Sequence, residues 1–275
     1  DLFNTNISFT IREVNQSVPI ITNAEFAHSI DILEFSGNIH VFQFMNMLGE
    51  SLSRRTLGVG RATNIIGRFN DLLISEMPAL DTKLQGTSLA AAGIRQKTGV
   101  TVIGIMESGK FKAATPHTVI TSKSILMLAG SAEQFKAFDL RYQARYDRTD
   151  DVQVVILGGG RVGKAAAETL ARHGICYKIV EKRTARITDA EKNHFIVGDA
   201  ADINTLQAAG INEAKSVIVT THSDDMNIYL TFYCRQLRPD VQIISRSILE
   251  RNVTKLHMAG ADLVMSYASL GAGTI

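Results

Sequence analysis

The sequence predicts an α/β protein with a doubly wound parallel sheet of the Rossmann type, a small α+β domain and part of a second Rossmann unit. Three observations carry this prediction. A glycine-rich turn at 158–163 separates an apolar strand from a helix, strand and helix patterns alternate over residues 152–266, and one segment of the chain occurs twice. Alternation of this kind implies a parallel sheet that is covered by helices.

An internal repeat organises the chain. With a constant offset of 223, residues 1–52 align with residues 224–275 without a gap. The identical pairs are Asp1/Asp224, Asn4/Asn227, Phe9/Phe232, Arg12/Arg235, Val18/Val241, Ile20/Ile243, Ile21/Ile244, Leu33/Leu256, Gly37/Gly260 and Val41/Val264. We therefore expect one structural unit to occur in both halves.

Each copy of this unit is predicted to contain a helix, a strand, a second helix and a short strand. Apolar residues at helical spacing mark the first helix, β-branched residues mark the strand, and Gly37 or Gly260 closes the second helix. The elements are expected at 1–14, 18–21, 24–36 and 39–42 in the first copy and at 224–237, 241–244, 247–259 and 263–265 in the second.

Only the second copy has a front half, residues 152–223. Strands are expected there at 152–157, 176–180, 195–197 and 216–220, with helices at 162–173 and 203–209. Because the first copy alone would leave a sheet edge exposed, we expect the natural protein to extend upstream by at least three strands, with or without a second glycine loop, and to continue beyond Ile275. The strand at Ile20 and Ile21 should then pair with strands from outside residues 1–52.

The sequence between the two copies has a different pattern, in which short β-like runs surround one helix. Residues 53–138 are predicted to form the small α+β domain with its lead-in helix, with strands at 72–76, 100–106 and 124–129 and one helix at 88–96. Residues 139–151 form a charged linker. Asp147, Asp150 and Asp151 at its end suggest a cation site, but a solvated hinge with a helix-capping aspartate is the simpler interpretation.

Composition excludes several classes of protein. The net charge is +2 and no long run of like charges occurs, so nucleic-acid binding is not indicated. No apolar run reaches the roughly 18 residues of a membrane helix, so this segment should be soluble. Neither the two cysteines nor the seven histidines show metal-ligand spacing, and the cysteines are expected to be reduced in a cytosolic protein.

The glycine-rich turn carries the clearest chemistry. Gly158, Gly159, Gly160, Arg161, Val162 and Gly163 fit the pattern G-x-G-x-x-G. Gly158 permits the tight turn, Gly160 lets the backbone approach a pyrophosphate, and Gly163 lets the helix pack close to the strand. The free N–H groups and the dipole of the helix would hold the anion. The alternative is a glycine turn without a ligand.

The end of the second strand suggests which nucleotide binds. Glu181 lies 18 residues after Gly163, where a carboxylate accepts hydrogen bonds from both ribose hydroxyls and repels a 2′-phosphate. This favours NAD or an adenosine nucleotide over NADP. Lys182 and Arg183 argue the other way, since either could neutralise a phosphate.

Further candidates follow the later strands. Asp199 and Ala200 come after the third strand, where Asp199 either lines the adenine side of the cleft or caps a helix. Thr220 and Thr221 end the fourth strand at the carboxyl edge, where ligands of open α/β sheets bind. Arg246 either faces the same cleft or lies on the surface.

Catalytic groups are hard to find in the sequence. His222 is the one candidate for the acid or base of an NAD-dependent oxidoreductase, which is the alternative function. The absence of a recognisable catalytic set favours a regulator over an enzyme, and a pseudo-site that binds nothing is a third hypothesis.

Residues 152–275 resemble the N-lobe of an RCK domain, also called TrkA-type or KTN. The matching residues are the GGGRVG turn, Glu181, Gly198-Asp199-Ala200, and Thr220-Thr221 followed by Asp224-Asp225-Met226-Asn227. Residues 87–131 resemble the RCK C-lobe, although Ser122-Lys123 stands where the family often has Gly-Asp. Residues 1–52 resemble the back half of another N-lobe, so the chain is similar to a protein with tandem RCK units.

This resemblance implies a regulatory module of a potassium channel pore or of a potassium-transporter subunit, on the cytoplasmic side of the membrane. Such modules form homo-oligomeric gating rings built from dimers, and they bind NAD, ADP or ATP. Some members bind Ca²⁺, whose site the sequence does not place. Because residues 41–48 are strongly apolar, we expect dimers through the N-lobe helices and residues 44–55.

Overall fold

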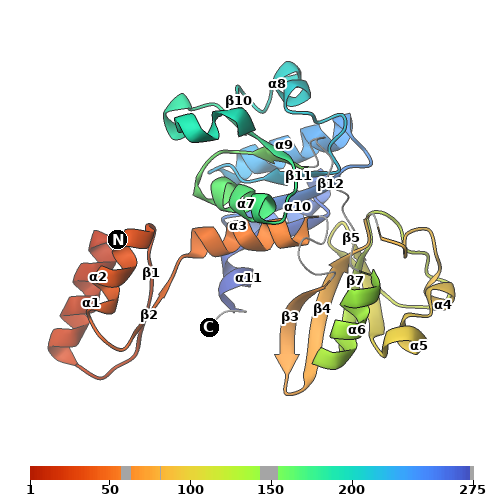
Figure 1. Ribbon diagram of the computed structural model, residues 1–275, viewed down its shortest axis with the longest axis horizontal. Coiled ribbons are helices and arrows are strands. Elements are labelled where there is room, and N and C mark those ends of the chain that lie inside the picture. Colours follow the sequence, from red (N-terminus) through yellow and green to blue (C-terminus); the bar gives the residue numbers. More distant parts are fainter. Residues whose placement is uncertain (57–62, 81, 143–153, 273–275) are drawn as a thin grey trace.

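The computed structural model describes residues 1–56, 63–80, 82–142 and 154–272, which form three sheets (Figure 1). The largest is a six-stranded parallel sheet in the order β10-β9-β8-β11-β12-β13. Its strands are β8 (Val154–Leu157), β9 (Tyr177–Glu181), β10 (Phe195–Val197), β11 (Ser216–Val219), β12 (Gln242–Ser247) and β13 (Leu263–Ser266). The predicted doubly wound sheet is confirmed.

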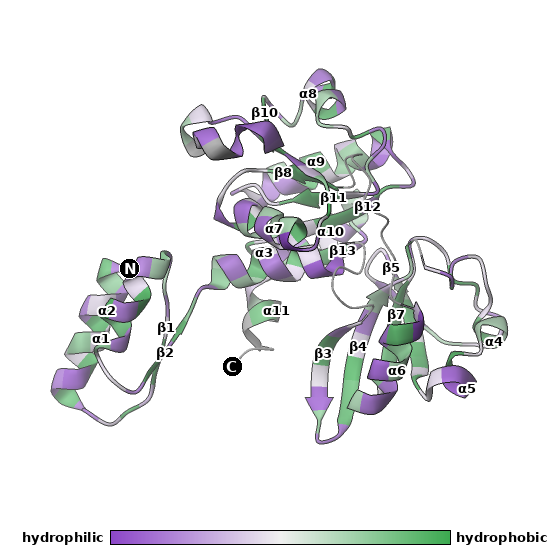
Figure 2. Cartoon of the chain, viewed as in Figure 1, coloured by the Kyte–Doolittle hydropathy of each residue, from purple (hydrophilic) through white to green (hydrophobic). Residues whose placement is uncertain are grey.

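Helices cover both faces of this sheet. They are α7 (Arg161–Arg172), α8 (Ile203–Ala208), α9 (Asp224–Leu237), α10 (Val253–Ala259) and α11 (Tyr267–Ala272), with short 3-10 helices η2 (Thr184–Arg186), η3 (Asp189–His194) and η4 (Glu250–Asn252). Ile156 and Ile218 belong to the core on the α7 face, whereas Val155 and Val217 belong to the core on the α9 face. The central strands are therefore hydrophobic along their length, while the helices have mixed hydropathy (Figure 2).

The first copy of the repeat forms α1 (Leu2–Val14), β1 (Ile20–Asn23), η1 (Ala27–Ser29), α2 (Ile30–Glu34) and β2 (Ile39–Phe42). β1 and β2 pair in parallel with Ile21 opposite His40, and β12 and β13 pair with Ile244 opposite Leu263. By the offset of 223, Ile244 is equivalent to Ile21 and Leu263 is equivalent to His40. The two copies therefore have the same strand register.

Two equivalent arginines hold the two copies in the same way. Arg12 donates hydrogen bonds to the carbonyl oxygens of Val18 and Gly37, and its counterpart Arg235 makes the two equivalent bonds. Gly37 has a positive φ of 66°, and Gly260 at the equivalent turn has a φ of 114°. The glycine that ends the second helix of each copy is thus required by the turn.

A carboxylate explains why the second helix of each copy is shorter than predicted. Asp1 accepts hydrogen bonds from the amides of Glu25 and Phe26, and its counterpart Asp224 accepts from the two equivalent amides. These amides lie in loops that precede the helices, so α2 begins at residue 30 rather than 24, and α10 begins at residue 253 rather than 247. The periodicity that predicted the helices does not report such long-range bonds.

The first copy differs from the second in its sheet. Among the described residues β1 pairs only with β2, whereas β12 pairs with both β11 and β13. The expected pairing of Ile20 and Ile21 with strands from outside residues 1–52 is therefore not found within the described ranges. Ile21 is 50% exposed, whereas its counterpart Ile244 is fully buried.

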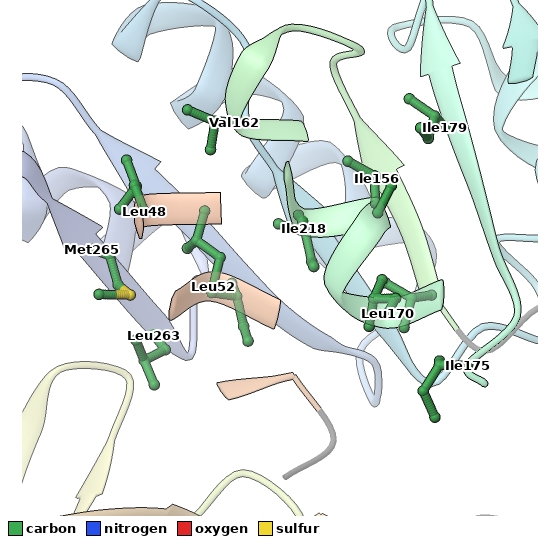
Figure 3. Packing of buried hydrophobic residues seen from close by; sticks show 14 of the residues in the cluster. Leu48, Leu52, Ile156, Val162, Leu170, Ile175, Ile179, Ile218, Leu263 and Met265 are labelled. Carbon is green, nitrogen blue, oxygen red and sulfur yellow. The ribbon is translucent and has the colours of Figure 1, made fainter. Parts of the chain in front are cut away.

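The helix at the end of the first copy, α3 (Phe44–Arg55), packs against α7. Leu48 and Leu52 are fully buried, and Figure 3 shows them beside Leu263 and Met265 of β13. The Ser53 hydroxyl donates to the carbonyl oxygen of Ala166 over 2.8 Å. The apolar side of α3 is thus covered within the chain, and the expected dimer contact through the N-lobe helices and residues 44–55 stays a prediction.

Residues 64–142 form a separate α+β unit (Figure 1). Its antiparallel sheet has the order β3-β4-β7-β5-β6. The elements are β3 (Asn64–Phe69), β4 (Leu72–Pro78), α4 (Leu89–Ala92), α5 (Ile94–Thr98), β5 (Thr101–Glu107), β6 (Lys110–Ala113), β7 (Ile125–Gly130) and α6 (Ala132–Tyr142). The prediction missed β3 and β6. It also joined α4 and α5, which Gly93 separates with a positive φ of 58°.

The acidic end of the linker, Asp147, Asp150 and Asp151, lies outside the described residues.

Candidate functional site

The glycine turn has the geometry that its sequence predicts. Gly158 has a φ of 112°, and a Cβ atom there would lie 3.1 Å from the carbonyl carbon of Thr220. A Cβ atom on Gly163 would collide with the carbonyl oxygen of Gly158. Gly160 is the N-cap of α7 and has no side chain to cap it, so the first N–H groups of the helix face the turn.

Glu181 lies beneath this turn at the end of β9. Its carboxylate accepts hydrogen bonds from the amide of Gly159 over 2.9 Å and from the amide of Arg183 over 2.8 Å. The residue is 6% exposed, and it lines the cavity above the turn. Glu181 therefore both shapes the turn and lines the space above it.

Asp199 and Lys182 form an ion pair at the rim. The carboxylate of Asp199 lies 2.9 Å from the Lys182 ammonium and accepts the amide of Ala201. This backbone hydrogen bond, followed by the bond from Lys182, lowers the pKa of Asp199. The N-cap of α8 is Asp202, which accepts from the amide of Thr205, so the capping interpretation of Asp199 was wrong.

Two threonines fix the turn from the neighbouring strand. The Thr220 hydroxyl donates to the carbonyl oxygen of Gly158 over 3.0 Å. Thr221 donates its hydroxyl to the side-chain oxygen of Asn227 over 2.7 Å, and Asn227 in turn donates to the carbonyl oxygen of Arg246. These bonds connect the carboxyl ends of β8, β11 and β12.

Arg246 at the end of β12 is 7% exposed. Its guanidinium lies over the ring of Tyr267, 5.8 Å from the ring centroid. The Nε atom is buried and has no hydrogen-bond partner among the described residues. Burial lowers the pKa of Arg246. The interpretation of Arg246 as a surface residue was therefore wrong.

One cavity of about 480 Å³ collects these residues. The predicted residues that line it are Gly158, Gly160, Arg161, Val162, Glu181, Lys182, Asp199, Ala200, Thr220, Thr221 and Arg246. Gly159 and Gly163 do not line it. A Cβ atom on Gly159 would lie 2.7 Å from the ring of Phe195, so both glycines act in packing.

Two residues that the sequence analysis considered as alternatives also line the cavity: Arg183, as a partner of a phosphate, and His222, as an acid or base. The other lining residues were not predicted as ligand contacts, and they are Met45, Val180, Gly198, Met226 and Leu230. Val180 and Gly198 are next to predicted residues in the sequence, which could have identified them. Met45 comes from α3, and no local signal in the sequence connects it to a glycine turn more than a hundred residues away.

The first residue of α7 contacts the first copy of the repeat. The Arg161 guanidinium lies 2.7 Å from the Glu25 carboxylate and 5.9 Å from the ring centroid of Phe26. The hydrogen bond from Arg161 lowers the pKa of Glu25. The glycine turn is thus connected through one side chain to the loop after β1.

The described residues contain neither a candidate metal site nor a helix that could span a membrane. They contain no group of three or more histidine, cysteine, aspartate and glutamate side chains that could hold a metal ion. None of the described helices is both long and apolar enough to span a bilayer.

Known proteins share both units. Residues 154–267 match the TrkA-N domain and residues 74–141 match the TrkA-C domain. The chain is 30% identical over 122 residues to probable potassium channel protein 2 of Methanocaldococcus jannaschii, covering 42% of this chain and 36% of the relative. It is 33% identical over 112 residues to potassium channel protein 1 of the same organism, covering 39% and 34%.

Solved structures extend the similarity to the first copy. The RCK domain of GsuK is 34% identical with a TM-score of 0.71, covering 98% of this chain and 58% of that one. The GsuK channel bound to NAD is 34% identical with a TM-score of 0.69, covering 98% and 48%. This chain thus spans about a third of the two potassium channel proteins and about half of the GsuK chains. With a TrkA-N domain, a TrkA-C domain and this neighbour over nearly its whole length, the chain belongs to the RCK, or TrkA-type, family.

Proposed function

We propose that this chain is a ligand-sensing module that regulates a potassium channel or transporter by binding NAD or an adenine nucleotide at the glycine turn. The observation that carries the proposal is the single cavity joining the N-terminus of α7 to Glu181 and Asp199. A helix N-terminus binds phosphate, and a carboxylate at the end of the second strand binds ribose hydroxyls.

The charges around the ribose position favour a nucleotide without a 2′-phosphate. Glu181 is buried there, and the ammonium of Lys182 is already paired with Asp199. A 2′-phosphate would meet the Glu181 carboxylate, with Lys182 engaged elsewhere. NAD, ADP and ATP therefore fit better than NADP, and the description of one GsuK channel as bound to NAD supports the dinucleotide.

A sensor needs binding energy that differs between two conformations, and it needs no catalytic group. We place the module on the cytoplasmic side of the membrane, in a homo-oligomeric ring that acts on a pore or transporter subunit in the same or a separate chain. The potassium channel relatives support this assignment. We assign the RCK N-lobe to residues 152–275, the C-lobe with its lead-in to 53–138, and the linker to 139–151, of which residues 139–142 belong to the end of α6.

Calorimetry with NAD, NADH, ADP and ATP tests the proposal. Gly160→Asp places a side chain and a negative charge at the pyrophosphate position and should abolish binding. Glu181→Ala should weaken binding by about 1–3 kcal/mol, the range for a lost charged hydrogen bond. Gly67→Asp in β3, where a Cβ atom meets only ordinary contacts, is the matched control and should bind normally. Unchanged affinity in the first two variants would place the ligand elsewhere.

The alternative is an NAD-dependent oxidoreductase, which the position of His222 in the cavity favours. An enzyme would oxidise NADH in the presence of a small carbonyl substrate and would lose this activity in His222→Asn. A sensor would bind NADH stoichiometrically without turnover.

A further inference from the structure

Arg246 has a defined place in the row of groups at the carboxyl edge of the sheet. Glu181 ends β9, Gly158 follows β8, Thr220 follows β11, and Arg246 lies in β12. Leu157 pairs with Val219, and Val219 pairs with Ser245, so residues 158, 220 and 246 are level with one another. Neighbouring strands lie about 4.8 Å apart, which puts Arg246 about 10 Å from Gly158 on the side away from Glu181.

The side chain of Arg246 points to the face of the sheet on which α7 begins. Ile156, Ile218 and Ile244 all belong to the core cluster on the α7 face. Side chains alternate along a strand, so Arg246, two residues after Ile244, lies on the same face. The guanidinium is therefore on the side of the helix N-terminus and lines the same cavity.

No carboxylate forms an ion pair with this guanidinium within the described ranges, although the charge of Asp224 acts on it. Nε has no hydrogen-bond partner, and no ion pair to Arg246 is present there. Asp224 is the nearby acid, but its oxygens accept from the amides of Ile248 and Leu249 and from the side chain of Asn252. A buried cation without an anion is unfavourable, so the site lacks an anion that a ligand would supply.

We propose that Arg246 binds the terminal phosphate of an adenine nucleoside diphosphate and makes the site prefer ADP to AMP and to NAD⁺. This rests on the proposed function. With the ribose at Glu181 and the first phosphate at the N-terminus of α7, the next group of the ligand extends toward β11 and β12. In ADP that group is an anionic phosphate, which suits the fork of an arginine. In NAD⁺ the second phosphate is esterified to the nicotinamide riboside, so it carries one negative charge fewer than the terminal phosphate of ADP, and the nicotinamide ring beyond it is cationic. AMP has no second phosphate to reach Arg246.

Calorimetry on the full chain with AMP, ADP and NAD⁺ as probes tests this. Arg246→Gln should weaken ADP binding about 10- to 100-fold, the equivalent of one lost charged hydrogen bond, and should leave AMP affinity unchanged. Arg246→Lys, which keeps the charge but not the fork, should retain part of the preference for ADP. Arg95→Gln, an exposed arginine of α5, is the control and should match the unmodified chain.

Thermal unfolding without ligand separates a binding role from a structural one. Because Arg246→Gln removes a buried unpaired charge, the Tm of the variant should be equal to or above that of the unmodified chain. A fall in Tm together with equal losses for AMP and ADP would show a structural role and would overturn the inference. If the unmodified chain binds ADP but prefers NAD⁺, the inference fails while the proposed function stands. If it binds none of the three nucleotides, both fail.

Discussion

The two copies of the repeated unit keep the same polar contacts but differ in burial. Arg12 and Arg235 make equivalent bonds to two carbonyl oxygens, and Asp1 and Asp224 accept equivalent amides. Yet Ile21 is half exposed in a two-stranded sheet, whereas its counterpart is fully buried in a six-stranded one. The backbone conformation of this unit is therefore fixed by its own hydrogen bonds, which are the same in a two-stranded and in a six-stranded sheet.

The copies also differ in the residues that would meet a ligand. Arg246 in the second copy corresponds to Asn23 in the first, whose side-chain oxygen accepts the amide of Phe44 at the start of α3. The same backbone position thus carries a cation over a cavity in one copy and a helix contact in the other. The two copies have the same backbone, and the side chain at a single position determines whether that position lines a cavity or contacts a helix.

The largest expected difference between the copies concerns their equivalent arginines. Arg235 also lies 2.7 Å from the carboxylate of Asp262, whose side chain is 4% exposed, while the residue equivalent to Asp262 in the first copy is Ile39. Arg235→Ala should lower the free energy of unfolding by about 3–5 kcal/mol, because it leaves a buried carboxylate unpaired. Arg12→Ala removes only bonds to carbonyl oxygens and should cost about 1 kcal/mol. Urea denaturation measures both, and equal losses would contradict a distinct role for Asp262.

The helices at the ends of the two copies provide the next test. Gly49 in α3 stands where the second copy has Ala272, and a Cβ atom on Gly49 would lie 2.7 Å from the Cβ of Ala165. Gly49→Ala should therefore lower the free energy of unfolding by about 1–3 kcal/mol through overpacking against α7. Gly67→Ala in β3 is the control with ordinary contacts. If both variants unfold at the same urea concentration, α3 is not closely packed against α7.

The smallest effect is expected at the contact between the first copy and the glycine turn. Glu25 and Arg161 are 42% and 40% exposed, so Glu25→Gln should cost less than about 1 kcal/mol, and the loss should diminish in high salt. Since Arg161 lowers the pKa of Glu25, the contribution of the pair is present above the ordinary pKa of a glutamate and is lost as the pH falls through the lowered value.

A double-mutant cycle with Arg161→Gln measures this coupling, and Glu34→Gln on α2 is the control. Glu25 competes with a ligand phosphate for Arg161, so Glu25→Gln should also bind ADP up to about fivefold more tightly. Weaker binding in this variant would instead make Glu25 part of the ligand site.

Periodicity and the glycine motif were sufficient to predict the six-stranded sheet, because buried parallel strands are continuously apolar and the turn has few alternatives. They were not sufficient for β3 and β6, which lie at the edges of the small sheet and have weak alternation. The late start of α2 and α10 depends on Asp1 and Asp224, which are more than twenty residues away along the chain. Among the cavity residues, Met45 could not be predicted because it arrives through the packing of α3 on α7.

The close packing of α3 on α7 connects the Rossmann-type domain to the small domain. A slip of one helical turn, about 5.4 Å, would bring Met45 or Ser53 to the place of Gly49, and either would put a Cβ atom where there is no room for one. The two helices therefore have a single register and behave as one solid part. One end of that part is the N-terminus of α7 at the glycine turn, and the other end carries Arg55, which is paired with Glu76 in β4 of the small domain. A tilt of α7 at the glycine turn is therefore passed on to Arg55 and the small domain, because the two helices have no room to slide against each other.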